Sequence, residues 1–216
     1  MKRTILILSL ALTCFYLPAI AQKARVGIVA GVTMSNLTGE TDGVNTNFDS
    51  RAGFTTGLIV DVPIGKTRFT FQPGVHYVQK GAVISETKDQ KDYVALRYAE
   101  FAFHFLYNTK GTKGVNIFAG VGPSVSLNLP SKTVVKFQDD GTKVEQNVIF
   151  GDEGAAQYNG IDWGASGIAG LNFRNGAMLS FNYNHGIRNL TPGKNSENSI
   201  RNSCFIVRLG LLIKNK

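Results

Sequence analysis

The segment NIFAGVGPSVSLNL, residues 116–129, alternates between two kinds of side chain. Every second residue from Ile117 to Leu129 is aliphatic, apart from Pro123, whereas the residues between them are Asn, Ser, Gly and one Phe. Alternation with period two places the two sets on opposite faces of a β-strand. The segment therefore predicts a strand with one apolar face and one face that is polar or nearly bare.

The same alternation recurs along the rest of the chain. The predicted strands cover residues 25–36, 52–62, 68–79, 94–107, 116–129, 161–173, 177–188 and 199–213. They are about 11–15 residues long, whereas strands of globular proteins have about 5–6 residues and a tilted strand needs about 9–11 to cross a bilayer. No helical period appears after residue 21, so we predict an all-β fold.

The connections between these strands alternate in length. Segments 37–51, 80–93, 130–160 and 189–198 are long or medium, whereas 63–67, 108–114 and 174–176 are short. Outer-membrane barrels have short periplasmic turns and longer extracellular loops. We therefore predict an eight-stranded antiparallel up-and-down transmembrane β-barrel. Its apolar faces would contact outer-membrane lipid, and its small polar faces would line a narrow lumen.

The N-terminal residues have the pattern of a secretory signal peptide. Lys2 and Arg3 precede an uncharged apolar stretch, and Ala19-Ile20-Ala21 fits a small-x-small cleavage site. We expect residues 1–21 to be removed and residues 22–216 to form one barrel domain.

The net charge of the chain is +8, but its Lys and Arg residues do not form runs, which argues against nucleic acid as a partner. Only Cys204 would remain, so no intramolecular disulfide is expected.

Aromatic residues on the apolar faces fall near the predicted strand ends. They form two sets, Phe69, Tyr107 and Phe173 near short turns, and Tyr77, Trp163 and Tyr183 near long loops. Aromatic girdles at the two membrane interfaces have this distribution. The alternative interpretation is that these rings fill a protein core.

Several segments resemble a known family, the PorT-like, porin-family outer-membrane β-barrel domain of the Gram-negative Bacteroidota. The resemblance is carried by VGIVAGVTMSNL, LRYAEFAFHFLYN, IFAGVGPSVSLNL, IDWGASGIAGLNF and LSFNYNHGIRNL. The chain departs from the family pattern at Ala99-Glu100-Phe101, where the family has Glu-Ile-Pro, and in its non-aromatic C-terminus. The resemblance implies an outer-membrane location but no settled activity, because barrels of one fold have many roles.

Polar residues on the bare faces identify a candidate lumen cluster. Its members are Asp61, Gln72, His76, Glu100, His104 and Arg208. Glu100 and Arg208 fall near the middle of opposite strands, and an eight-stranded barrel is just filled by its side chains. We expect a buried ion pair that plugs the lumen. A path for protons or small ions, or a small-ligand pocket, is the alternative.

We expect neither a cofactor nor a metal, and no enzyme activity. His76, His104 and His185 lie on separate predicted strands, so they lack metal-ligand spacing. His185 would lie on the lipid face near the outer interface, and we identify no Ser and acidic residue within its reach.

Loop 130–160 is the longest connection and carries side chains of both charge signs. Exposed loops on rigid scaffolds often bind partners. The leading hypothesis is therefore a plugged barrel that serves as a scaffold or accessory, with an envelope or secretion protein bound through this loop. The alternatives are a narrow pore or transporter for small solutes and a soluble lipocalin-like barrel that binds an apolar ligand. A mobile, solvated loop would also fit the composition.

Overall fold

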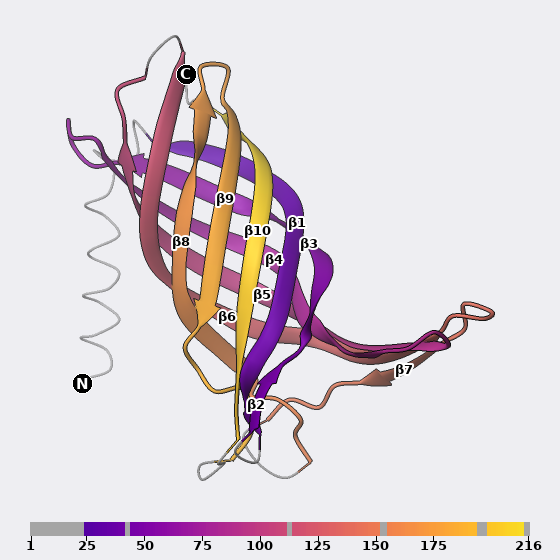
Figure 1. Cartoon of the computed structure of the whole chain (residues 1–216). Helices are drawn as coiled ribbons and strands as arrows, with labels where there is room; N and C mark the ends of the chain where they lie inside the picture. Colours follow the sequence, from indigo (N-terminus) through magenta and orange to yellow (C-terminus); the bar gives the residue numbers. More distant parts are fainter. Residues whose placement is uncertain (1–23, 42–43, 112–113, 152–154, 194–197, 214–216) are drawn as a thin grey trace, which may run out of the picture.

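The computed structural model describes residues 24–41, 44–111, 114–151, 155–193 and 198–213 (Figure 1). The predicted signal peptide, residues 1–21, lies outside the described residues. Within these ranges the chain forms ten β-strands. They are β1 (Arg25–Thr41), β2 (Val44–Asn47), β3 (Asp49–Pro63), β4 (Phe69–Glu86), β5 (Gln90–Asn108), β6 (Val115–Phe137), β7 (Lys143–Asn147), β8 (Ile161–Phe173), β9 (Ala177–Gly186) and β10 (Ser199–Ile213). No helix among the described residues is long and apolar enough to span a membrane.

Strands β1, β3, β4, β5, β6, β8, β9 and β10 form a closed barrel in chain order. Closure comes from the pairing of β1 with β10, which runs from Val26 opposite Ile213 to Glu40 opposite Ser199. All pairings between consecutive barrel strands are antiparallel. The predicted all-β, up-and-down fold is therefore confirmed.

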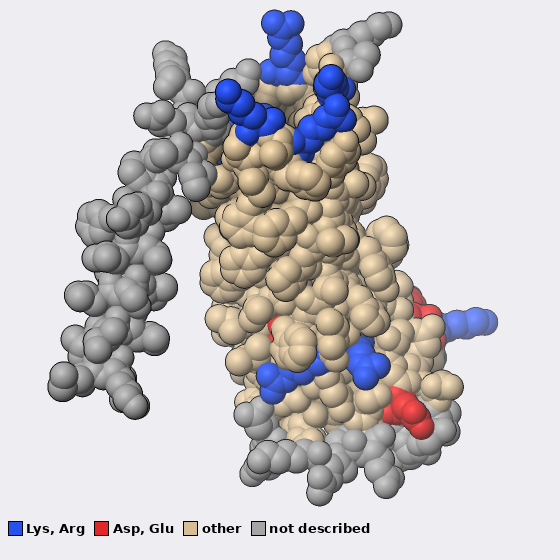
Figure 2. Space-filling model, turned by 90° about the vertical axis from the view of Figure 1, so that its left-hand side faces the viewer, with Lys and Arg blue, Asp and Glu red and all other residues tan. Residues whose placement is uncertain are grey.

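The alternation of side chains places the apolar set on the outside of the barrel. Val32, Val121 and Leu209 are 62–68% exposed, whereas the intervening Thr33, Ser124 and Arg208 are buried in the lumen. Figure 2 shows the result on one wall, where a broad band without Lys, Arg, Asp or Glu separates basic groups near the two ends. An apolar exterior around a polar lumen is the reverse of a lipocalin-like barrel, so the structure does not support that alternative.

The two ends of the barrel differ, and we call them the turn end and the loop end. The turn end, uppermost in Figure 1, holds the start of β1, the end of β10 and the short connections β3–β4, β5–β6 and β8–β9. At the β8–β9 hairpin the Gly176 amide donates to the Phe173 carbonyl at 3.0 Å, and Gly176 has φ of 91°. A glycine with positive φ closes a three-residue hairpin loop.

At the loop end, three predicted loops are wrong in part, because strands occupy most of segments 37–51 and 80–93 and part of segment 130–160. Segment 37–51 contains the end of β1, all of β2 and the start of β3. Segment 80–93 continues β4 to Glu86 and begins β5 at Gln90, and segment 130–160 contains the end of β6 and all of β7. These extensions pair as β4–β5–β6–β7 and project from the barrel (Figure 1). The register shifts between Val83 and Ser85 and between Ala95 and Arg97. Such bulges interrupt the alternation, which made the extensions resemble loops in the sequence.

Two hydrophobic clusters fill the parts of the barrel that the polar side chains leave. One includes Val29, Leu106, Phe118 and Met178 among inward-facing residues of the barrel strands. The other lies toward the loop end and includes Leu37, Leu96, Tyr98 and Leu190, with Phe48, Phe150, Tyr158 and Ile200 packed against it. We call this second cluster the apolar cap, because it covers the lumen at the loop end.

Candidate functional site: the filled lumen

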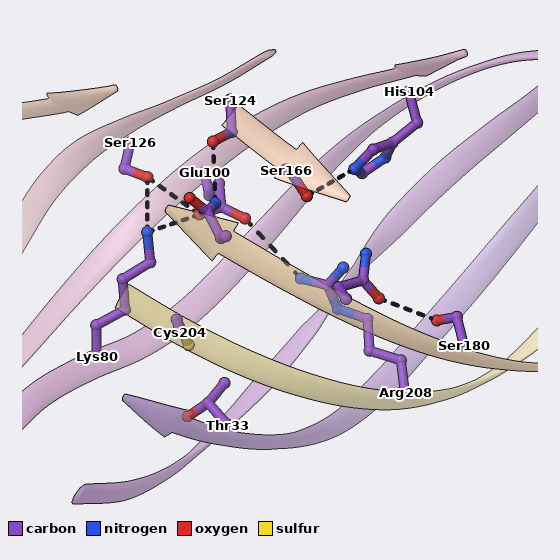
Figure 3. Close-up of polar contacts among 12 residues, drawn as sticks. Thr33, Lys80, Glu100, His104, Ser124, Ser126, Ser166, Ser180, Cys204 and Arg208 are labelled. Atoms are coloured by element: carbon purple, nitrogen blue, oxygen red, sulfur yellow. Dashed lines mark hydrogen bonds and ion pairs between the residues drawn. The ribbon is translucent and has the colours of Figure 1, made fainter. Parts of the chain in front are cut away.

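The centre of the lumen is occupied by an ion pair between Lys80 of β4 and Glu100 of β5. Lys80 Nζ lies 2.9 Å from Glu100 Oε2, and both side chains are buried. The same carboxylate oxygen accepts hydrogen bonds from Ser126 Oγ and Asn184 Nδ2, each at 3.1 Å. Figure 3 shows these groups converging from several strands. Multiple partners compensate for the cost of removing a carboxylate from water.

The ion pair predicted between Glu100 and Arg208 is the weaker of two contacts. Arg208 Nη2 lies 3.9 Å from Glu100 Oε1, one ångström farther than the distance from Lys80 to the other carboxylate oxygen. The sequence analysis missed Lys80 because it ended the strand at Gln79. The parity of the strand could have identified it, since Gln72, His76 and Lys80 share one face.

Asp162 of β8 adds a second carboxylate to this centre. Its Oδ2 lies 3.8 Å from Lys80 Nζ, and the side chain is buried. The ammonium group also lies 5.3 Å from the centre of the Tyr98 ring, within range of a cation–π interaction. Lys80 therefore joins the polar network to the apolar cap, to which Tyr98 belongs.

The two predicted histidines lie beside a small cavity next to this network. His104 Nε2 is 3.0 Å from Ser166 Oγ. Both ring nitrogens of His76, and Nε and Nη2 of Arg208, have no hydrogen-bond partner among the described residues. The cavity that His76, His104 and Arg208 line has a volume of about 10 Å³. That is about the space that one water molecule requires.

Asp61 and Gln72 form a second polar group nearer the turn end. Gln72 Nε2 donates to Asp61 Oδ1 at 3.3 Å, and Arg25 forms an ion pair with the Asp61 carboxylate. Gln72 also lines the small cavity. The structure thus places all six predicted lumen residues inside the barrel, and four of them, Gln72, His76, His104 and Arg208, line the same cavity.

The six predicted girdle residues all point outward. Phe69 and Tyr107 make an edge-to-face contact near the turn end, with ring centroids 5.5 Å apart. Toward the loop end, Tyr183 contacts Phe205 at 5.2 Å and Tyr77 contacts Phe54 at 5.3 Å. The remaining two girdle residues, Phe173 and Trp163, are exposed near opposite ends of β8.

His185 has a serine neighbour that the sequence analysis did not find. Ser203 Oγ lies 3.4 Å from His185 Nδ1, because the two residues face each other across β9 and β10. Such a contact depends on strand register, which no sequence spacing shows. No Asp or Glu in the described part of the chain is hydrogen-bonded to His185. Likewise, the described residues include no group of three potential metal ligands.

The part of segment 130–160 that forms β6 and β7 presents an exposed, charged sheet surface. All residues of β7 are exposed, and Lys132 forms an ion pair with Glu145 across the two strands. The hydrogen bond from Lys132 and its positive charge lower the pKa of Glu145. In the turn between the strands, hydrogen bonds from Thr142 lower the pKa of Asp140. This surface is therefore a folded hairpin, unlike the loop that the sequence predicted.

Comparison with known proteins agrees with this architecture. The sequence model of the family described as "Outer membrane protein beta-barrel domain" matches residues 20–191, which include seven of the eight barrel strands. The chain belongs to this family. The match supports an outer-membrane location for this barrel. A search of curated proteins found no match.

Several solved structures are similar to this chain at low sequence identity. Ail, the attachment invasion locus protein of Yersinia pestis, has a TM-score of 0.45 and 11% identity, with 88% of this chain and 99% of Ail covered. Neisserial surface protein A has a TM-score of 0.43 and 10% identity, with 86% and 96% covered. The outer membrane enzyme PagL has a TM-score of 0.39 and 16% identity, with 83% and 98% covered.

Proposed function

We propose that this protein is a closed outer-membrane barrel that acts as a scaffold or accessory for an envelope or secretion partner. The observation that carries this proposal is the filled lumen. The Lys80–Glu100 centre is buried, the cavity beside it has a volume of about 10 Å³, and the apolar cap covers the loop end. A barrel whose interior is occupied in this way offers its outer ends and its wall for interaction.

Conductance separates this proposal from the pore or transporter alternative. The purified protein, inserted into a planar lipid bilayer, should give no discrete single-channel steps at moderate voltage. A large porin that is purified and inserted in the same way provides the positive control. Reproducible steps that disappear in a variant with a bulky lumen residue, such as Ser180→Phe, would reject the closed barrel in favour of a pore.

The extension formed by β4, β5, β6 and β7 is the surface that we propose for the partner. It lies at the loop end, which faces outward in outer-membrane barrels. The β7 strand is exposed along its whole length and pairs with β6. An exposed strand edge can receive a further strand from another protein, with main-chain hydrogen bonds providing affinity.

Site-specific crosslinking in intact cells tests this surface. A photoreactive amino acid at Val144, which is 56% exposed on β7, should yield an adduct of one discrete mass. The same amino acid at Arg174, in the β8–β9 turn, is the matched control and should not yield that adduct. An identical pattern at both positions, or none at Val144, would reject the extension as the binding surface.

Two finer assignments belong to the same proposal. The five segments quoted above support membership of the PorT-like branch found in Bacteroidota, and the Ala19-Ile20-Ala21 pattern supports export by a cleaved signal peptide. The scaffold role requires no catalytic step and no cofactor. N-terminal sequencing of the mature protein should begin at Gln22, and an intact Met1 in the membrane fraction would contradict the cleavage.

A further inference from the structure

The outer wall of the barrel has a groove on the surface of β8, between β6 and β9. Small residues of β8, Gly164, Ala165 and Gly167, line its floor, and Val121, Trp163 and Tyr183 are among the larger residues around it. The groove has a volume of about 540 Å³, within the range of about 300–1,000 Å³ that is usual for small-molecule sites. It lies on the exposed apolar exterior of the barrel, to which Val121, Trp163 and Tyr183 belong.

Strand register places the groove in the half of the wall nearer the loop end. Val121 lies opposite Gly167 near the middle of β8, and Val125 lies opposite Trp163 near the start of this strand. On the other side, Ala165 lies opposite His185. The groove therefore runs from the mid-level of the barrel toward the interface on the loop side, along the direction of an acyl chain.

Polar and basic groups follow where the groove approaches the interface. His185 lines the groove and contacts Ser203 of β10 at 3.4 Å. Arg201 lies two residues before Ser203 on the same outward face and is exposed. Thr38 of β1 is the residue opposite Arg201. Glu40, a carboxylate on the same face, lies two residues farther toward the loop end. An anionic group at the end of the groove would thus meet a hydroxyl, an imidazole and a guanidinium.

We propose that this groove binds one acyl chain of a phosphate-bearing lipid in the leaflet on the loop side, with the phosphate at Arg201. The chain fills the space above the small residues of β8, which the lipid-facing wall otherwise leaves unpacked. The guanidinium is suited to the phosphate because it offers a planar set of donors with fixed geometry. Ser203 and His185 supply further hydrogen bonds to the ester or phosphate oxygens.

Trp163 makes this proposal directly measurable, because it lines the groove and is the single tryptophan of the chain. The purified protein is refolded into vesicles that contain either phosphatidylglycerol or phosphatidylcholine with brominated acyl chains. Bromine quenches tryptophan fluorescence on contact, so the dependence of quenching on lipid fraction gives the relative association of each lipid. We expect an approximately five-fold preference for phosphatidylglycerol, the effect of about one basic side chain at an anionic surface.

Four variants distinguish binding in the groove from general electrostatic attraction to anionic lipid. Arg201→Gln should abolish the preference, and Arg201→Lys should retain most of it. Arg174→Gln removes an exposed arginine from the β8–β9 turn, at the opposite end of the barrel, and should leave the preference unchanged. Gly167→Leu fills the groove, and a Cβ built at Gly167 meets no atom within 4 Å, so the barrel should tolerate it. This variant should lose the preference and show weaker quenching by both lipids.

Several results would overturn the proposal. Equal quenching of the original protein by both lipids would show that the groove contacts lipid without selecting it. A preference that survives both Arg201→Gln and Gly167→Leu would place the selective site elsewhere, as would its loss in Arg174→Gln. Each variant is first checked for a shift in gel mobility between unboiled and boiled samples, which reports a folded barrel, and Arg201→Lys keeps the test valid if Arg201→Gln does not fold.

Discussion

Lys80 and Glu100 meet in the lumen although they are not cross-strand partners. Glu100 lies opposite His76 and Lys80 lies opposite Leu96, so the lysine side chain must reach along the barrel to bring Nζ within 2.9 Å of the carboxylate. This arrangement leaves the His76 ring beside the cavity, and it directs the ammonium group toward Ser126, which accepts a hydrogen bond at 3.3 Å. The plug therefore depends on the length of one side chain as much as on its charge.

Replacing one partner of this pair should be more harmful than replacing both. Lys80→Met leaves the Glu100 carboxylate buried without its nearer cation, and loss of one partner of a buried ion pair typically costs about 3–5 kcal/mol. The double variant Lys80→Met/Glu100→Leu removes both charges and should recover part of that loss. Urea unfolding of the barrel in lipid vesicles measures the free energies. Additive losses in the double variant would show that the two residues do not act as a pair.

Arg208 should contribute less than Lys80. Its guanidinium is 3.9 Å from Glu100, and two of its nitrogens have no hydrogen-bond partner among the described residues. We therefore expect Arg208→Met to destabilise the barrel less than Lys80→Met in the same unfolding measurement. Glu100→Ala should resemble Lys80→Met or exceed it, because it affects both cations. An Arg208→Met loss larger than that of Lys80→Met would reverse this ranking of the two ion pairs.

Most of the fold could be predicted from the sequence, because a membrane barrel imposes period two on each strand. The outward set around Val32 and Val121 and the inward set around Ser124 and Arg208 follow from that period alone. The extensions of β4 and β5 could not be predicted in the same way, since bulges near Ser85 and Leu96 shift the phase of the pattern. The contact between His185 and Ser203 also depends on register, and pairing that joins distant segments has no local signal.

The residues of the candidate site could be predicted from the sequence, but their interaction partners could not. Strand parity placed Glu100, His104 and Arg208 in the lumen. The choice of Lys80 over Arg208 as the main cation depends on side-chain reach and on the exact level of each residue along the barrel. Those quantities are set by the stagger of neighbouring strands, which the sequence pattern leaves open.

The β8–β9 hairpin should tolerate substitution at its glycine poorly. Gly176 has φ of 91°, and a Cβ there would lie 2.4 Å from the Leu212 carbonyl oxygen. Gly65, in the β3–β4 turn, has φ of 60°, but a Cβ there meets no atom within 4 Å. Gly176→Ala should therefore lower the fraction of heat-shifted protein on gels more than Gly65→Ala does. Equal effects of the two substitutions would mean that the positive φ alone destabilises the variants, and that the contact between the new Cβ and the Leu212 carbonyl oxygen adds nothing.

The Lys132–Glu145 ion pair of the β6–β7 hairpin should weaken as the pH falls. Lys132 lowers the pKa of Glu145 in the folded hairpin below its value in the unfolded chain. The ion pair therefore stabilises the hairpin fully at pH values above the pKa of Glu145 in the unfolded chain. This stabilisation is lost as the pH falls through the pKa of Glu145 in the folded hairpin. Carbon-13 NMR of the Glu145 carboxyl should give a titration midpoint that rises in Lys132→Gln. A midpoint that does not change in this variant would show that the ion pair is absent in solution.

The hairpin tip and the apolar cap should differ in their importance for assembly. Deleting residues 138–142 removes exposed positions only, so the barrel should keep its heat-dependent gel shift. Leu190 is fully buried in the apolar cap with Leu96 and Val148, and Leu190→Ala should cost about 2–5 kcal/mol through lost burial and a new cavity. The temperature at which the gel shift disappears measures both changes. If the deletion lowers this temperature as much as Leu190→Ala does, the projecting hairpin stabilises the barrel, and its proposed role as a separate partner-binding surface loses its basis.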